Sequence, residues 1–386
     1  MSALLDNGLS ILGYLGILLG SLVLSLVLVP LALRVATRRQ VLDHPGGYKQ
    51  QEAPVPYLGG LAMLLSFALA VVAAALVRPP SAGLDELLVI VGLASALSVV
   101  GLIDDLRGLG VTVRLVAITG AAIALWFGGT GVLLFGNSWL DGAITVLWIV
   151  GITNAVNLLD NMDGLSAGVA AIAAATFFGV AALNGQFLVA ALSIALVGCA
   201  VGFLRHNRYP AKIYMGDAGS LFLGFLLAAL GIRLRLDAGP PIAVFVPLVA
   251  LSVPIFDTAL VTVTRVLDGR SPFRGGADHA SHRLVRLGLR VPTAVGLVCG
   301  AGLGSAWLAI AMSRQTDLVA AWLLVSLWLS LAAMATIILV RATGRGNPVV
   351  LRRDVVQEGE GPAGKREVAP ASNHGTPEAK TVKGDV

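Results

Sequence analysis

The chain has 386 residues and a net charge of +5; 56% of the residues are hydrophobic and only 13% are charged. Soluble globular domains carry about 25% charged residues, so the composition excludes an ordinary water-soluble protein and predicts an all-α, polytopic integral membrane protein. The two cysteines, Cys199 and Cys299, lie in apolar runs, which excludes a disulfide-stapled fold or a CxxC zinc site. We expect the lipid bilayer as a partner and no nucleic acid, because cytoplasmic loops account for the positive charge.

Apolar stretches follow one another along the chain, each close to the roughly 20 residues that a spanning helix needs. There are eleven, at 9–33, 57–77, 86–103, 112–128, 139–157, 166–184, 187–204, 218–232, 241–264, 291–313 and 318–340. The first has no basic segment before it, so we interpret it as an uncleaved helix and not as a signal peptide. The sequence thus predicts about 11 transmembrane helices.

The distribution of Lys and Arg predicts how these helices are inserted. One set of alternate loops holds 15 of these residues and the other set holds 4, and positively charged loops face the cytoplasm. We therefore expect an outside N-terminus, a cytoplasmic C-terminus and a multi-pass protein of the inner (cytoplasmic) membrane. Residues 1–341 would form the membrane-embedded domain, and residues 342–386, rich in Gly, Pro and charged side chains, a disordered cytoplasmic tail.

The first predicted cytoplasmic loop is rich in Pro and Gly, which predicts a rigid, turn-rich segment that leads into the second helix. It contains Lys49, which could meet an anionic ligand or simply be solvated. At the end of the third stretch come two adjacent acids, Asp104 and Asp105. Such a pair suits a proton acceptor or a hard divalent cation, and a solvated helix end with Arg107 as counter-ion is the alternative.

Amides and carboxylates recur at three-residue steps at the end of the fifth stretch. The series is Asn154, Asn157, Asp160 and Asp163, followed by Gly164. On a helix such side chains line one face, where they offer oxygen ligands and hydrogen-bond acceptors. A polar cap on a re-entering helix is the alternative.

Two further segments complete the chemistry on this face. Asp217 opens an apolar helix after Tyr214, where it could act as the N-cap, and the small residues around it leave room for a phosphate or a metal at the positive helix end. The loop 265–290 brings His279, His282 and Arg283 together. That combination suits phosphate recognition, although a basic loop that only obeys the charge rule remains open.

Together these residues point to phosphoryl transfer. The reaction needs a metal to neutralise charge, groups that align the reactants and a base near the nucleophile. A membrane setting indicates that one substrate is a lipid. Because the acids lie at predicted helix ends, we expect the active site on the cytoplasmic face.

In this combination of motifs the sequence resembles the polyprenyl-phosphate N-acetylhexosamine-1-phosphate transferases, the superfamily that includes the phospho-N-acetylmuramoyl-pentapeptide transferases. The motifs are DxP…K…PVPxLGG at 43–60, the Asp pair at 104–105, NAxNxxDxxDGL at 154–165, GDxGS at 216–220 and HxSHR at 279–283. The resemblance covers about residues 43–290. It implies transfer of a sugar-1-phosphate from a UDP-sugar to a polyprenyl phosphate, with release of UMP.

The resemblance also implies residue roles. Asp217, assisted by Asn157, would bind Mg²⁺, or Mn²⁺ in its place. Asp104 or Asp105 would be the base for the lipid phosphate or help place the metal. The remaining roles fall into a catalytic pair, Asp160 and Asp163, and a substrate-binding set, Lys49, Asn154, Tyr214, His279, His282 and Arg283. Tyr214 would stack on uracil, and a homodimer is one possible assembly.

Two departures from the family pattern bear on the donor sugar. The family's HxHH element has Ser281 here in place of its middle His, and the first loop has Gln50 and Gln51 where a His often follows the basic residues. The His element fits the N-acetylglucosamine branch better, so UDP-GlcNAc is the predicted donor. The alternatives are a muramoyl-pentapeptide transferase, a polytopic transporter and a membrane scaffold without chemistry. Direct attack by the lipid and a covalent two-step route both remain open.

Overall fold

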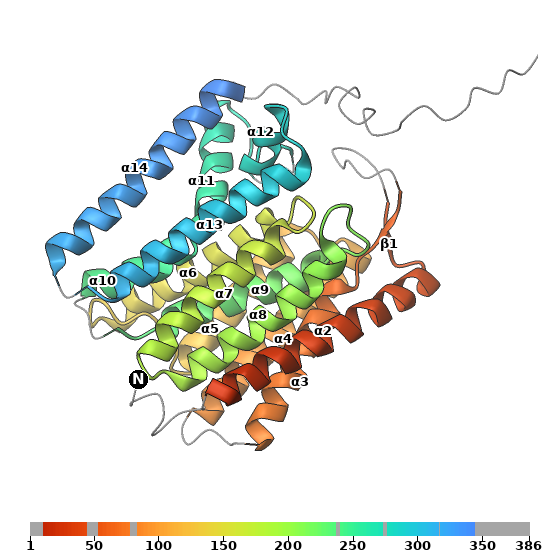
Figure 1. The fold of residues 1–386 in the computed structure, drawn as a ribbon, viewed down its shortest axis with the longest axis horizontal. Helices are drawn as coiled ribbons and strands as arrows, with labels where there is room; N and C mark the ends of the chain where they lie inside the picture. Colours follow the sequence, from red (N-terminus) through yellow and green to blue (C-terminus); the bar gives the residue numbers. More distant parts are fainter. Residues whose placement is uncertain are drawn as a thin grey trace, which may run out of the picture. The chain divides into compact units, whose positions relative to one another are not determined.

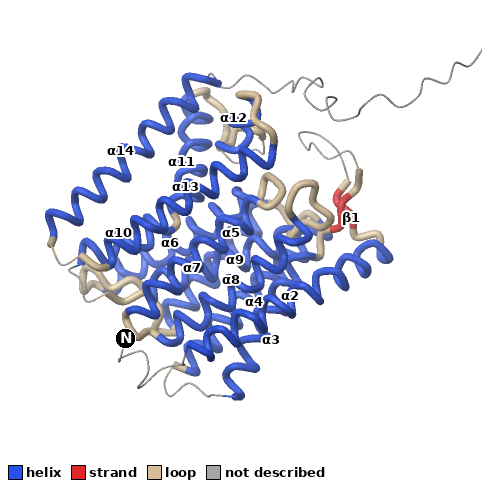
Figure 2. The backbone as a smooth tube through the Cα atoms, viewed as in Figure 1, coloured by secondary structure: helices blue, strands red, loops and turns tan. Residues whose placement is uncertain are grey.

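The structure of the protein is a computed structural model that describes residues 11–44, 53–77, 83–236, 240–272, 276–315 and 317–343. Within these ranges the chain is almost wholly helical, which confirms the all-α expectation (Figures 1 and 2). The elements are α2 Ile11–Arg39, β1 Leu42–Asp43, β2 Val55–Pro56, α3 Gly59–Val77, α4 Leu84–Arg107, α5 Val111–Phe127, α6 Ser138–Leu159, α7 Leu165–Leu183, α8 Phe187–Asn207, α9 Gly216–Arg233, α10 Pro240–Ala250, α11 Ser252–Leu267, α12 Ala280–Arg286, α13 Val291–Ser313 and α14 Leu318–Thr343. The expected tail at 342–386 lies outside the described residues from residue 344 onward.

Nine helices in the described ranges are long and apolar enough to cross a membrane. Helix α5 is apolar but has only 17 residues, and α10 and α11 form a bent pair. Each predicted apolar stretch therefore contains an apolar helix, which makes the chain a multi-pass membrane protein. The exact number of crossings and the orientation remain predictions.

The stretch 241–264, predicted as one helix, is divided in two. Helices α10 and α11 meet at Leu251 and differ in direction by 74°. Pro254 provides the physical reason, because it has no N–H to donate to the carbonyl of Ala250 and its ring crowds that carbonyl. Pro247 inside α10 adds a second interruption. The stretch therefore contains two helices, whereas one was expected.

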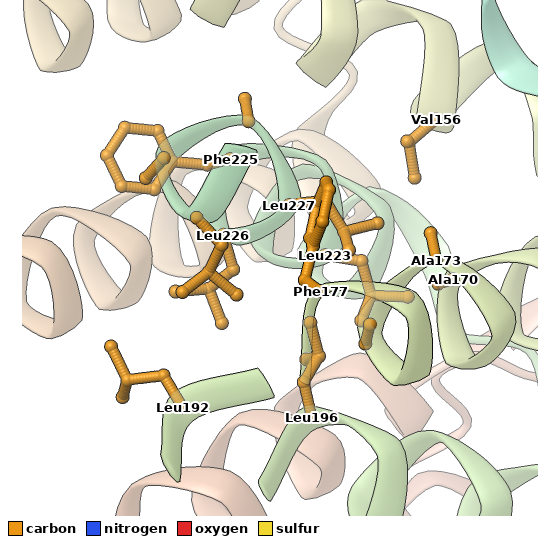
Figure 3. Close-up of a cluster of buried hydrophobic side chains, with 14 of the residues drawn as sticks. Val156, Ala170, Ala173, Phe177, Leu192, Leu196, Leu223, Phe225, Leu226 and Leu227 are labelled. Carbon is orange, nitrogen blue, oxygen red and sulfur yellow. The ribbon is translucent and has the colours of Figure 1, made fainter. Parts of the chain in front are cut away.

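Helix α9 lies at the centre of the packed helices. Every residue from Ala218 to Ile232 is buried, and α9 packs against α3, α4, α6, α7 and α8. Figure 3 shows Leu223 and Leu227 of α9 among side chains of α6, α7 and α8. Helices such as α2 and α14 instead expose large apolar side chains, as expected where lipid is the solvent.

Candidate active site

The start of α9 is held against α3 and α4 by glycines. A Cβ on Gly60 of α3 would lie 2.1 Å from the backbone nitrogen of Gly219, and a Cβ on Gly101 of α4 would lie 2.4 Å from the carbonyl carbon of Asp217. Real Cβ atoms do not approach backbone so closely, so both positions require glycine. This close packing fixes the backbone of Asp217 beside the end of α4.

Asp105 caps α9 from a distance. Its Oδ1 accepts the N–H of Asp217 at 2.9 Å, and its Oδ2 accepts the N–H of Ala218 at 3.2 Å. These N–H groups belong to the first turn of the helix, where backbone N–H groups have no acceptor within the helix. Negative charge is stabilising at this end of a helix. Asp217 was predicted as the N-cap, but the helix begins at Gly216, so Asp217 lies inside the first turn. Asp105 supplies the capping oxygens instead.

An amide and a carboxylate meet next to this cap. Asn157, in the last turn of α6, donates from Nδ2 to Asp217 Oδ1 at 2.7 Å and to Ser220 Oγ at 2.8 Å. Because both donor positions of the amide are used, its oxygen is left as an acceptor for a further partner. The structure thus brings Asp105, Asn157 and Asp217 together, although they come from three helices far apart in the sequence.

Arg114, in the first turn of α5, pairs with acidic side chains of the cluster. The guanidinium of Arg114 contacts Asp217 Oδ2 and lies 3.3 Å from Asp104 Oδ2. Asp104 also accepts the N–H of Gly110 at 3.2 Å and is only 8% exposed. From the sequence, Arg114 was only one of the 15 Lys and Arg residues assigned to the predicted cytoplasmic loops. Its position in the first turn of an apolar helix was the missed signal, because an ionisable residue there is a functional candidate by default.

The series of amides and carboxylates from Asn154 to Asp163 does not lie on one helix face. Helix α6 ends at Leu159, Asp160 is its C-cap residue, and Gly164 with φ +77° turns the chain into α7. The prediction that all four side chains share a helical face was therefore wrong beyond Asn157. Asn154 donates to the carbonyl of Val150 in its own helix at 2.8 Å. Within the described residues it forms no hydrogen bond with the acidic cluster.

Asp160 and Asp163 lie in the turn after α6. Burial, followed by the negative charges of Asp217 and Asp105, raises the pKa of Asp160 to about 8. Burial also raises the pKa of Asp163, whose Oδ2 accepts the N–H of Ala211 at 2.8 Å. Asp163 thereby ties this turn to the segment that precedes α9.

The first loop reaches the same region through its backbone. Tyr214 donates its N–H to the carbonyl of Pro56 at 2.8 Å and accepts the N–H of Gly59 at 3.0 Å. Tyr57 donates its hydroxyl to the carbonyl of Asp105 at 3.1 Å. Burial, followed by the charge of Asp163, raises the pKa of the Tyr214 phenol. Lys49 lies outside the described residues, so its expected role remains a prediction.

The basic segment around α12 is more deeply buried than a substrate-contacting loop was expected to be. His279 is 5% exposed, His282 9% and Arg283 0%. Arg283 donates from Nε to the carbonyl of Asp278 at 2.9 Å, so a direct contact with a substrate phosphate would require it to leave its place. Burial lowers the pKa of His282 to about 4, and its Nδ1 is buried without a hydrogen-bond partner. An unsatisfied buried nitrogen is costly, which keeps His282 a candidate ligand contact.

Ser281 links this segment to the acidic turn. Its hydroxyl donates to Oδ1 of Asn161 at 2.7 Å, and Asn161 directly follows Asp160. The loop after α11 and the turn after α6 therefore meet, although 120 residues separate the two bonded side chains. Position 281 was noted in the sequence only as a departure from the family pattern.

The oxygen donors fit Mg²⁺ in their chemistry. The described residues include no group of three or more His, Cys, Asp or Glu side chains that could hold a metal ion. Mg²⁺, however, commonly uses one or two carboxylates and completes its shell with waters and substrate phosphates. The carboxylate of Asp217 and the amide oxygen of Asn157 match that habit.

Fold and site together define a polytopic helical membrane protein whose spanning helices end in a cluster of carboxylates, an amide and one arginine. The sequence model of glycosyl transferase family 4 matches residues 87–235, which include most of α4 and all of α6 and α9. The probable undecaprenyl-phosphate N-acetylglucosaminyl 1-phosphate transferase of Bacillus subtilis is 32% identical over 278 residues, which are 70% of this chain and 76% of the relative.

Two other relatives carry related names. The decaprenyl-phosphate N-acetylglucosaminephosphotransferase of Mycobacterium leprae is 33% identical over 293 residues, 66% of this chain and 72% of the relative. The phospho-N-acetylmuramoyl-pentapeptide-transferase of Geobacillus kaustophilus is 35% identical over 243 residues, 56% of this chain and 72% of the relative. The chain belongs to glycosyl transferase family 4, within the superfamily that its motifs indicated, and it is a membrane-embedded phosphosugar transferase.

Proposed function

We propose that this enzyme transfers N-acetylglucosamine-1-phosphate from UDP-GlcNAc to a polyprenyl phosphate, such as undecaprenyl or decaprenyl phosphate. The products are polyprenyl-diphosphate-GlcNAc and UMP, and the reaction is a first lipid-linked step in the synthesis of cell-envelope polysaccharides. The observation that carries the proposal is the cluster of Asp104, Asp105, Asn157 and Asp217 around Arg114. The names of two relatives support the acceptor and the sugar.

The two adjacent acids take different roles in this proposal. Asp105 uses both carboxylate oxygens on the first turn of α9, so it holds Asp217 in place. Asp104 instead lies 3.3 Å from the guanidinium of Arg114, which would bring the lipid phosphate next to it, so Asp104 is the residue proposed to accept the proton of that phosphate. An oxygen of that phosphate attacks the β-phosphorus of UDP-GlcNAc, and the bond between this phosphorus and the oxygen bridging to UMP breaks.

Mg²⁺ is the proposed cofactor, held by Asp217 and Asn157, and it would neutralise the charge of the diphosphate when bound. Asp160 and Asp163 would shape the pocket next to Asp217, and Tyr214 would face the uracil. Arg114 would bind the phosphate groups that enter the cluster. Lys49, Asn154, His279, His282 and Arg283 remain predicted substrate contacts, and a homodimer remains a prediction.

The proposed place of the reaction is the cytoplasmic face of the inner membrane. It is supported by the excess of Lys and Arg in the loops that flank the acidic helix ends. UDP-GlcNAc does not cross a bilayer, so inside-out vesicles should turn it over and right-side-out vesicles should not. Equal activity in intact vesicles of both kinds would contradict the orientation.

The test of the reaction uses the purified full chain in detergent with UDP-GlcNAc, undecaprenyl phosphate and Mg²⁺. We expect release of UMP that requires both substrates and stops when EDTA is added. Parallel reactions with UDP-MurNAc-pentapeptide and UDP-GalNAc test the donor. The muramoyl-pentapeptide reaction is the second candidate, because a relative with that name aligns over 72% of its own length. Turnover of that donor alone would replace the proposal.

A further inference from the structure

Helix α11 carries a buried acid to which the proposed function gives no role. Asp257 lies in the apolar first half of α11 and is 3% exposed. A carboxylate at such a position is costly unless it is partnered. Both of its oxygens are used at the start of α12. Oδ2 lies 2.7 Å from Nδ1 of His279, and Oδ1 accepts the N–H of Ala280 at 2.7 Å.

This pairing selects one form of the imidazole. An ionised carboxylate can only accept hydrogen bonds, so Nδ1 of His279 carries the proton in the pair. Nε2 is then the ring nitrogen with the free lone pair when the imidazole is neutral. The His282 ring lies edge-on to His279, with ring centroids 6.0 Å apart. The carboxylate of Asp257 thus determines which ring nitrogen of His279 carries the proton and which can accept a hydrogen bond.

The same segment is attached to the acidic cluster. Ser281 follows Ala280 and donates to Asn161 at 2.7 Å, and Asn161 is the neighbour of Asp160. On its other side, Arg283 anchors the segment to the carbonyl of Asp278. Asp257 therefore fixes the beginning of a segment whose next side chain meets the turn that carries Asp160.

We propose that Asp257 is a positioning residue for the transfer reaction, holding His279 in the Nδ1-protonated form so that Nε2 is presented to the substrate. Carboxylates orient histidines in this way in metal sites and in hydrolase triads. The inference rests on the proposed function, because it assigns to His279 a contact with the sugar nucleotide. It adds a residue on α11, outside all the motifs that indicated the family.

The critical variant is Asp257→Asn. The asparagine has nearly the same volume, and its oxygen can still accept the N–H of Ala280. Its Nδ2, however, donates to Nδ1 of His279, which moves the ring proton to Nε2. We expect kcat for UMP release to fall by about 10–100-fold, with a smaller change in KM and a melting temperature close to that of the wild type.

Asp141→Asn is the matched control. Asp141 is 2% exposed, and its Oδ1 accepts two backbone N–H groups, those of Leu134 and Phe135, at 3.1 and 3.0 Å. It is a buried acid of α6 whose carboxylate bonds to backbone N–H groups and, within the described residues, to no imidazole. Asp141→Asn should lower the melting temperature and leave kcat within about twofold of the wild type.

A double-mutant cycle separates positioning from support of the fold. If Asp257 acts through His279, the double variant Asp257→Asn/His279→Ala loses no more activity than His279→Ala alone. A purely structural Asp257 would cost the same factor in both backgrounds, and that result would overturn the inference. So would Asp257→Asn with wild-type kcat.

A readout that needs no turnover keeps this inference separate from the proposed reaction. The chain has five histidines, so a ¹⁵N-histidine spectrum is simple, and His279→Ala assigns the signal. We expect the Nδ1–H form in the wild type and the Nε2–H form in Asp257→Asn. The same form in both would overturn the positioning role. Absence of UMP with every donor, with the tautomer change present, would instead refute the proposed function.

Discussion

Helices α4 and α9 run antiparallel, and both carry ionisable side chains at both ends. At one end Glu86 of α4 pairs with Arg233 of α9, with 2.5 Å between Oε2 and Nη2. Thr130 donates its hydroxyl to the other oxygen of Glu86 at 2.7 Å. One acid meets one base, so the charges of this pair cancel, and we call this the neutral end.

The other end of the same two helices, which we call the active end, is not neutral. Asp104 and Asp105 of α4 meet Asp217 of α9. Within the described residues, Arg114 is the one cation that forms ion pairs here, with Asp104 and Asp217. Three carboxylates and one guanidinium leave an excess of negative charge, which is unfavourable in an environment poor in water. The difference separates an ion pair that holds two helices together from a site that is built to receive cations or phosphate-bound metal.

The largest effect is expected for Asp217→Asn. The variant keeps the size of the side chain and a partner for Asn157, but it loses the charge proposed to hold Mg²⁺. UMP release should fall by about 10²–10³-fold, while Glu86→Gln at the neutral end should retain activity within about twofold. Full activity of Asp217→Asn would remove the assignment of the metal.

The packing at the active end is tested by Gly101→Ala. A methyl group there would overlap the backbone of Asp217, and such overpacking typically costs about 1–3 kcal/mol. We expect at least about a tenfold loss of UMP release together with a lower melting temperature. Gly92→Ala in the same helix is the control, because nothing lies within 4 Å of a Cβ there. Equal behaviour of the two variants would contradict the close approach of α4 and α9.

The neutral end should affect stability alone. Arg233→Met leaves Glu86 without its cation, and the side chains of the pair are only 26% and 17% exposed, so we expect a loss of about 1–3 kcal/mol in unfolding free energy. The double variant Glu86→Gln/Arg233→Met should recover part of that loss. Chemical unfolding in detergent measures both. Loss of kcat in these variants would show that the two ends are not separate.

Arg114→Gln should make the stability of the active end depend on metal. Without the guanidinium, Asp104 and Asp217 repel each other, so in EDTA the melting temperature should fall by a few degrees, about 1 kcal/mol for a chain of this size. Mg²⁺ should raise it again, and by more than it raises that of the wild type. The same response to Mg²⁺ in both proteins would argue against a cation site at these carboxylates.

The comparison also shows what the sequence could reveal. The apolar stretches predicted each long helix, because length and hydrophobicity suffice where lipid is the solvent. The motifs named Asn157 and Asp217 as partners. The sequence could not divide the roles of Asp104 and Asp105, because only the tertiary packing shows that Asp105 caps α9. The sequence could not assign a role to Asp257, since its partner follows 22 residues later in a different element.

Other errors arose where local patterns compete with tertiary contacts. The three-residue steps from Asn154 to Asp163 suggested a helix, but the helix ends at Leu159, and Asp163 bonds to the backbone of Ala211 instead. The basic pattern at 279–283 suggested phosphate recognition, which stays a prediction, and the fold adds only that Arg283 is buried. Composition reveals which groups are present, whereas the fold decides which of them face one another.

The smallest expected effect concerns the pH dependence of stability. The pKa of Asp160 is raised to about 8 in the folded protein, against about 3.9 for an unperturbed Asp. The folded state therefore favours the protonated form, so this residue lowers stability as the pH rises from about 4 to about 8, and its contribution is level above that range. Asp160→Asn mimics the protonated carboxyl group and removes this loss. In EDTA, the variant should melt at nearly the wild-type temperature near pH 4 and a few degrees higher at pH 8. A difference that stays constant across this range would show that Asp160 does not share the excess negative charge of the active end.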